Sequence, residues 1–99
     1  MFIVFLKFSD NKAQAGQFMQ GHQEWLQKGF DEGIFLLAGS IHPNLGGTIL
    51  LHNTHREELL KRVNEDPFVI ENVVHAEIIE IDPSKADKRL DFLLNTNRH

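Results

Sequence analysis

The chain has 99 residues, which is enough for one domain with a single hydrophobic core. Its formal net charge of −4, with scattered lysines and arginines, argues against a nucleic-acid partner, because phosphates require a positive surface. The lack of cysteine excludes disulfides, thiolate metal sites and thiol nucleophiles. The apolar run at residues 2–6 is too short to span a bilayer, so we expect no membrane partner and a cytoplasmic protein.

The first half of the chain predicts a strand, a helix and a hairpin. Residues 2–8 are almost continuously apolar, which indicates a strand covered on both faces. The apolar spacing over residues 14–33 predicts an amphipathic helix that ends in a glycine-bearing stretch. Residues 34–40 and 48–52 predict two more strands, joined as a hairpin by the proline- and glycine-containing loop at 42–47.

The second half predicts a helix, a strand and a further helix. Thr54 and Glu57 have the spacing of a capping box, so we expect the second helix to begin at Thr54. This helix should end at Asp66, because the residue before a proline is pushed out of the helical backbone region. Residues 73–81 predict a fourth strand, and residues 84–94 a short amphipathic C-terminal helix.

The resulting order is β-α-β-β-α-β, which predicts an α+β fold of the ferredoxin-like type with an antiparallel sheet. We assign residues 1–82 to this domain and residues 83–99 to a C-terminal helical extension. Two helices can cover only one face of a four-stranded sheet, yet the strands are apolar on both. The C-terminal helix is too short to cover the second face, so we favour a homodimer that packs sheet against sheet.

The predicted first helix carries a histidine within its apolar face. That face consists of Phe18, His22, Trp25, Leu26 and Gly29. A buried imidazole needs partners for its ring nitrogens, and Asp66 is the carboxylate that we expect to pair with His22. Judged from the residues alone, a hydrogen-bonded core histidine is the commoner role, and a catalytic base is the alternative.

Four segments resemble YciI-like (YCII-related) proteins: 22–26 (HQEWL), 33–40 (GIFLLAGS), 46–47 (GG) and 66–69 (DPFV). The resemblance covers residues 2–82. It implies a dimeric α+β barrel, the superfamily that also contains muconolactone isomerases and cofactor-free monooxygenases. It further implies a His-Asp active site, carried here by His22 and Asp66. Some members of the family are implicated in lyase-type elimination on chlorinated aromatic compounds, whereas most have no assigned substrate.

The chemistry open to His22 and Asp66 is general acid–base catalysis. An aspartate that accepts a hydrogen bond from one ring nitrogen leaves the other free as a base. Our first hypothesis is therefore a lyase or isomerase that acts on a small aromatic or lactone-like ligand. The alternative is a non-catalytic ligand-binding or accessory dimer of the same fold. Metal-assisted hydrolysis or oxygenation ranks last.

Three more residues are candidates for contact with the ligand. Ser40, at the end of the second strand, could bind a ligand oxygen or the His22 imidazole, or it could simply terminate the strand. A Ser-His-Asp hydrolase is disfavoured, because Ser40 lacks the Gly-x-Ser-x-Gly elbow. Trp25 and Phe68 could form an aromatic wall for a planar ligand, although core packing is the commoner role at such positions.

We expect neither a metal nor an organic cofactor. His52 and His55 have a spacing that could suit a metal ion, but no third strong ligand lies near them in the sequence. The glycine pair at 46–47 matches neither a phosphate-binding loop of the Walker type nor a dinucleotide-binding fingerprint.

Overall fold

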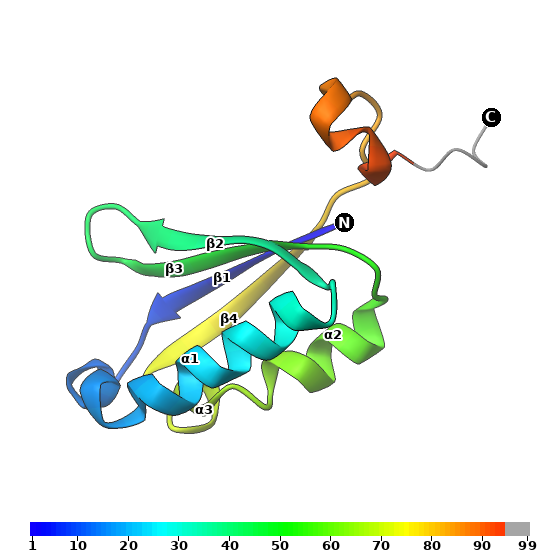
Figure 1. Cartoon of the computed structure of the whole chain (residues 1–99). Coiled ribbons are helices and arrows are strands. Elements are labelled where there is room, and N and C mark those ends of the chain that lie inside the picture. The colour runs from blue at the N-terminus through cyan, green and yellow to red at the C-terminus, as the bar shows by residue number, and fades with distance from the viewer. Residues whose placement is uncertain (95–99) are drawn as a thin grey trace.

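The computed structural model describes residues 1–94 as a four-stranded antiparallel sheet with helices against one face (Figure 1). The strands are β1 (Phe2–Phe8), β2 (Phe35–Ile41), β3 (Gly46–Leu51) and β4 (Val74–Glu80). The helices are α1 (Ala15–Asp31), α2 (Arg56–Val63) and α3 (Pro67–Ile70), with 3₁₀ helices η1 (Lys12–Gln14) and η2 (Lys88–Leu93). None of these described helices is long and apolar enough to cross a membrane.

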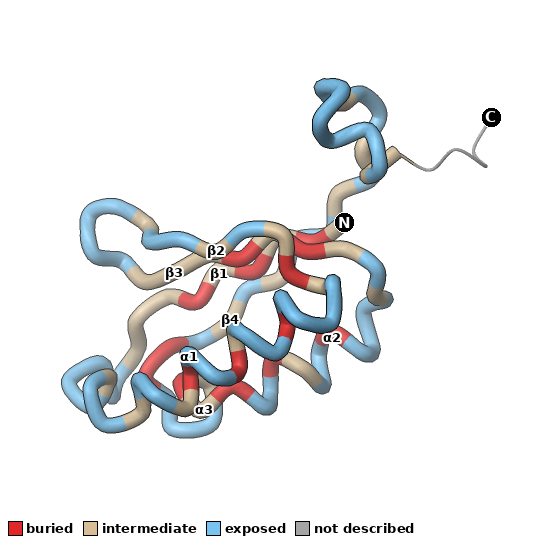
Figure 2. Tube along the Cα trace, in the orientation of Figure 1, coloured by how far each residue is buried: buried red, intermediate tan, exposed pale blue. Residues whose placement is uncertain are grey.

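The strand order β2-β3-β1-β4 confirms the predicted ferredoxin-like topology. Side chains alternate along β1, so that Phe2, Val4 and Leu6 are buried under the helices. The register places Val4 beside Ile49 of β3 and Ile78 of β4, which extends the same apolar layer across the sheet. In Figure 2 the buried segments accordingly lie where the sheet and the helices face each other.

The opposite face of the sheet carries an apolar row that crosses all four strands. Ile3 of β1 pairs with Leu50 of β3 and Ile79 of β4, and Leu50 pairs with Leu37 of β2. The edge members Leu37 and Ile79 are 56% and 47% exposed. The sequence-based expectation of strands that are apolar on both faces therefore holds for this row.

The predicted capping box at Thr54 is wrong. The N-cap residue of α2 is His55, which makes no side-chain capping hydrogen bond. Thr54 instead lies within hydrogen-bond distance of the Glu58 carboxylate, with Oγ1 and Oε2 3.3 Å apart. Asn53, just upstream, has a φ of 57°. This left-handed turn residue redirects the chain, and the helix begins only at Arg56.

The prediction of an α-helix over residues 84–94 is also wrong. Residues 81–87 form irregular chain and are followed by the short 3₁₀ helix η2, which stands off from the rest of the chain (Figure 1). A ring contact between Phe92 and His52 links this segment to the domain, with ring centroids 5.4 Å apart. So short a helix gains little stability without packing, which accounts for the difference. The last part of the expected extension, residues 95–99, lies outside the described residues.

Candidate active site

His22 lies on the face of α1 that packs against the sheet and α3. Its residue surface is 9% exposed, and its Nδ1 atom is 2.9 Å from Oδ1 of Asp66. The two residues are 44 positions apart in the sequence. The predicted pairing is therefore present in the structure, between the middle of one helix and the start of another.

Asp66 is held in place by its role as the N-cap of α3. Its backbone is extended, as expected before Pro67, and its Oδ1 accepts a 3.0 Å hydrogen bond from the backbone N–H of Phe68. The residue is 0% exposed. Its second oxygen, Oδ2, has no hydrogen-bond partner among the described residues, so Oδ1 makes both of the bonds that anchor this carboxylate.

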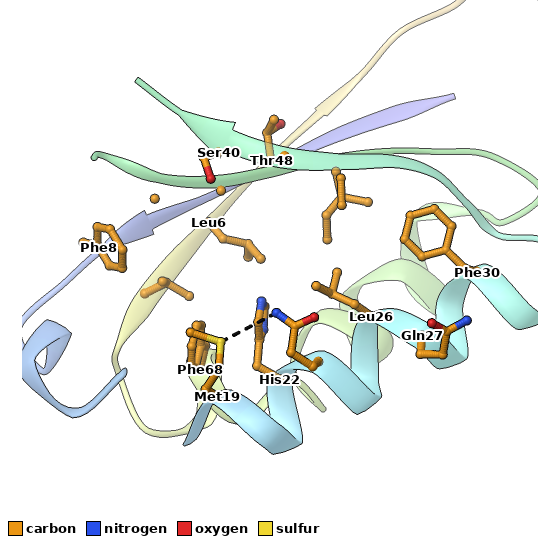
Figure 3. A pocket seen from close by; sticks show the side chains of 17 residues that line it. Leu6, Phe8, Met19, His22, Leu26, Gln27, Phe30, Ser40, Thr48 and Phe68 are labelled. Carbon is orange, nitrogen blue, oxygen red and sulfur yellow. Dashed lines mark hydrogen bonds between the residues drawn. The ribbon is translucent and has the colours of Figure 1, made fainter. Parts of the chain in front are cut away.

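The pairing determines which ring nitrogen can act as a base. An ionised carboxylate only accepts hydrogen bonds, so Nδ1 of His22 is the donor to Asp66. In the neutral imidazole the lone pair is then on Nε2. Figure 3 shows the His22 ring rising from α1 into a cavity, so that this second nitrogen is available to a ligand there.

Aromatic rings fix the plane of the imidazole. The ring of Phe68 is nearly parallel to that of His22, with centroids 4.0 Å apart and an interplanar angle of 4°. Trp25 also stacks on it, more loosely, at 5.9 Å and 26°. The Asp66 hydrogen bond and these ring contacts together give His22 a single orientation.

The cavity lies between α1 and the strands and has a volume of about 460 Å³. This volume is within the range of about 300–1,000 Å³ that is common for small-molecule sites. Its lining consists of Leu6, Phe8, Met19, His22, Gln23, Leu26, Gln27, Phe30, Ala38, Gly39, Ser40, Gly46, Gly47, Thr48, Ile49, Phe68 and Val74.

The sheet side of the cavity is shaped by Ser40 and the glycines opposite it. Ser40 pairs in register with Gly47 of β3, which in turn pairs with Leu6 of β1. Residues in one such row share a face of the sheet, and Leu6 faces the helices. Because Gly47 has no side chain, the space beside Ser40 stays open, and the Ser40 side chain projects toward the cavity in Figure 3.

The structure brings three of the five predicted site residues to the cavity wall: His22, Ser40 and Phe68. Asp66 lies behind His22, as expected for a residue that orients it. Trp25 is not among the lining residues. Its indole N–H donates a 2.8 Å hydrogen bond to the carbonyl of Arg62, and its ring packs edge-on against Phe35. Trp25 thus supports His22 from the core.

Gln23 and Gln27 are cavity-lining residues that the sequence reasoning missed. Neither belongs to the apolar face of α1 that the helical spacing defined, and both are exposed at the rim of the cavity. Gln27 donates to Asp31 at 2.8 Å, while the Gln23 amide has, among the described residues, only the Met19 sulfur as its partner, at 3.6 Å. The sequence signal that could have identified them is their position on α1, one and five residues after His22, which places them beside the histidine.

Within residues 1–94, no three His, Asp or Glu side chains are grouped so that they could hold a metal ion. The two histidines considered for a metal make other contacts. His52 packs against Phe92, and His55 lies 3.2 Å from the Glu58 carboxylate.

No protein-family model matches this sequence, and no match is found among curated proteins. Among solved structures, the chain is similar to 5-chloro-2-hydroxyhydroquinone dehydrochlorinase from Burkholderia phenoliruptrix AC1100, in complex with 2,5-dihydroxybenzoquinone. The TM-score is 0.68 at 12% sequence identity, over 90% of this chain and 98% of that one. At so low an identity the likeness extends to the fold, and it establishes that the two chains share an α+β architecture.

Proposed function

We propose that this chain is a small enzyme, independent of organic cofactors, that uses His22 as a general base on a small ring-shaped molecule. Lyase-type elimination or isomerisation is the reaction class. The observation that carries the proposal is the 2.9 Å bond from Nδ1 of His22 to Asp66, which leaves Nε2 toward a 460 Å³ cavity. The fold likeness to a dehydrochlorinase supports the same class.

The chemistry that follows from this geometry is a proton transfer. Nε2 of His22 removes a proton from a hydroxyl or carbon of the ring, and the electron pair left behind forms a new double bond. In an elimination from an aromatic chloride, the imidazolium first returns that proton to the chlorine-bearing ring carbon, which gives the keto tautomer. Removal of a second hydroxyl proton by Nε2 then forms the second carbonyl and expels chloride with its bonding pair, and the imidazolium releases this proton to solvent. Asp66 stabilises that imidazolium through the Nδ1 hydrogen bond.

Chloride release from 5-chloro-2-hydroxyhydroquinone tests the proposal, with wild type compared to His22→Asn. We expect the variant to fold and its turnover to fall by about 10²–10⁴-fold. Equal turnover by both proteins would show that His22 is not the base. If wild type binds the ring without releasing chloride, elimination is ruled out for this substrate, and the non-catalytic ligand-binding alternative is favoured.

We also propose that the chain belongs with the YciI-like proteins and works as a homodimer. The apolar row on the outer face of the sheet, from Leu37 through Leu50 and Ile3 to Ile79, supports the dimer. A second copy placed against this face would remove the half-exposed Leu37 and Ile79 from water. Sedimentation at micromolar concentration tests the dimer, which a well-folded monomer would refute.

A further inference from the structure

None of the described residues that line the cavity is Asp, Glu, Lys or Arg. Most of the lining is apolar, and the polar side chains that reach it, besides that of His22, are Gln23, Gln27 and Ser40. Thr48 lines the cavity only at its backbone, because its side chain lies on the outer face of the sheet with Leu50, where its hydroxyl donates to the carbonyl of Val4 at 3.0 Å. A carboxylate held against this wall would lose hydration with no Lys or Arg among the described lining residues to compensate, which is costly. The Lys12 ammonium lies 4.6 Å from the ring centroid of Phe8, at the Phe8 end of the cavity, and is not itself a lining residue.

The His22–Asp66 pair does not change this electrostatic character. With the carboxylate ionised, the pair carries a charge of −1 when the imidazole is neutral and of zero when it is protonated. In neither state does it present a net positive charge to a ligand. Asp66 is fully buried directly behind the ring, so its field acts on the cavity with little screening by water.

Besides Nε2 of His22, the side chains of Ser40 and Gln23 have hydrogen-bonding groups available on opposite sides of the cavity. The Ser40 hydroxyl, on β2, has no hydrogen-bond partner among the described residues. Within residues 1–94, the Gln23 amide on α1 has only the weak contact with the Met19 sulfur, which a ligand oxygen can replace at little cost. Figure 3 shows Ser40 on the sheet and the Met19 contact on the helix, with the cavity between them.

We propose that the cavity selects an uncharged, single-ring molecule with hydroxyl or carbonyl oxygens, and discriminates against rings that carry a carboxylate. Ser40 and Gln23 are the residues that we infer to bind the oxygens, and so to determine specificity. This inference rests on the proposed function in that it concerns the same cavity. It does not depend on catalysis, because binding alone displays it.

The test compares hydroquinone with 2,5-dihydroxybenzoate, which differs by one carboxylate. Both are titrated without oxygen into the His22→Asn variant, so that turnover cannot interfere, and amide NMR shifts report where and how tightly each binds. We expect hydroquinone to bind at least about 10-fold more tightly and to shift the signals of Ser40 and Gln23. Equal or tighter binding of 2,5-dihydroxybenzoate, or no binding of hydroquinone, would overturn the proposal.

Two substitutions that each add one positive charge to α1 make the test more specific. Gln23→Lys places a cation at the rim of the cavity, and Gln20→Lys places the same charge on an exposed part of α1 outside the lining. We expect Gln23→Lys to bring the affinity for 2,5-dihydroxybenzoate up to that for hydroquinone, and Gln20→Lys to leave the discrimination intact. Equal effects of the two substitutions would overturn the assignment to Gln23. Because turnover is measured separately, failure of catalysis by His22 would leave this result standing.

Discussion

The ring of Phe35 lies directly against the backbone of Gly29, on the side of α1 that faces the sheet. A Cβ atom at position 29 would overlap the Phe35 ring, which is 4% exposed and packs edge-on against Trp25. Close approach of the helix and β2 therefore depends on this glycine, even though glycine ordinarily weakens a helix.

We expect Gly29→Ala to destabilise the protein by about 1–3 kcal/mol, because the added methyl overpacks a rigid core. Gly16→Ala is the matched control, since a Cβ at position 16 meets nothing within 4 Å. In that exposed position alanine should be neutral or stabilise by up to about 1 kcal/mol. Urea unfolding of both variants measures the difference, and equal stabilities would contradict the packing argument.

Substitution of Asp66 can separate its charge from its hydrogen bonds. In Asp66→Asn, an amide oxygen can still accept from Phe68 N–H and from Nδ1 of His22, so we expect a folded protein. The imidazolium, however, loses its counter-charge. Turnover should therefore fall by about 10²–10⁴-fold, as measured by chloride release.

Asp66→Ala removes the hydrogen bonds as well. The lost N-cap costs about 1 kcal/mol, and the unpaired Nδ1–H of buried His22 costs about 1–3 kcal/mol more. Thermal unfolding should rank wild type and Asp66→Asn above Asp66→Ala. If Asp66→Asn were as unstable as Asp66→Ala, the charge of Asp66 would be what holds α3, rather than its hydrogen bonds.

The outer face of the sheet offers a test of the proposed homodimer in which the buried core is left unchanged. Leu37 and Ile79 are half-exposed in the single chain, so Leu37→Glu and Ile79→Glu should leave the fold intact. We expect each substitution to shift sedimentation from dimer to monomer, because like carboxylates would be buried together. Ile70→Glu, at a residue that is 61% exposed on α3, should leave the dimer unchanged.

Because Glu32 pairs with Arg62, we expect the protein to lose a small part of its stability in acid. The hydrogen bond between Glu32 and the Arg62 guanidinium, at 2.6 Å, lowers the pKa of Glu32 below the ordinary value of 4.5. The stabilisation is thus fully present above pH 4.5 and is lost as the pH falls through the lowered value. Glu32→Gln should flatten the stability curve in this acid range. Because the pair is exposed to solvent, 1 M salt should shrink the effect. A slope unchanged by the substitution would argue against this role.

Local sequence patterns were sufficient to predict which side of a regular helix faces the core. The helical spacing placed His22 and Trp25 on the buried face of α1. The Asp66-Pro67 step was interpreted only as the end of the second helix, whereas α2 ends at Val63 and Asp66 is the N-cap of α3. Pairing of His22 with Asp66 across 44 residues rested on the family resemblance and on the hydrogen-bonding need of a buried imidazole.

The patterns failed where the outcome depends on what lies nearby in space. Residues 84–94 have helical apolar spacing, but the described chain brings little more than His52 against them, and only a 3₁₀ turn forms. Likewise, Trp25 and Gln23 could be assigned to the core or to the cavity only once β2 and β3 were in place. The helical pattern predicts which face of α1 a residue occupies. Whether that face meets packed side chains or a cavity depends on the strands opposite it.

The Asp66 carboxylate that orients His22 also accepts a hydrogen bond from the backbone N–H of Phe68. Phe68 belongs to α3, a helix of only four residues. Exchange of that amide proton with deuterium requires α3 to open, and opening α3 releases Asp66 from its position. The exchange rate of the Phe68 amide therefore reports how often α3 opens and the His22–Asp66 pair comes apart. A molecule held against His22 should slow this exchange, although it does not touch the amide itself.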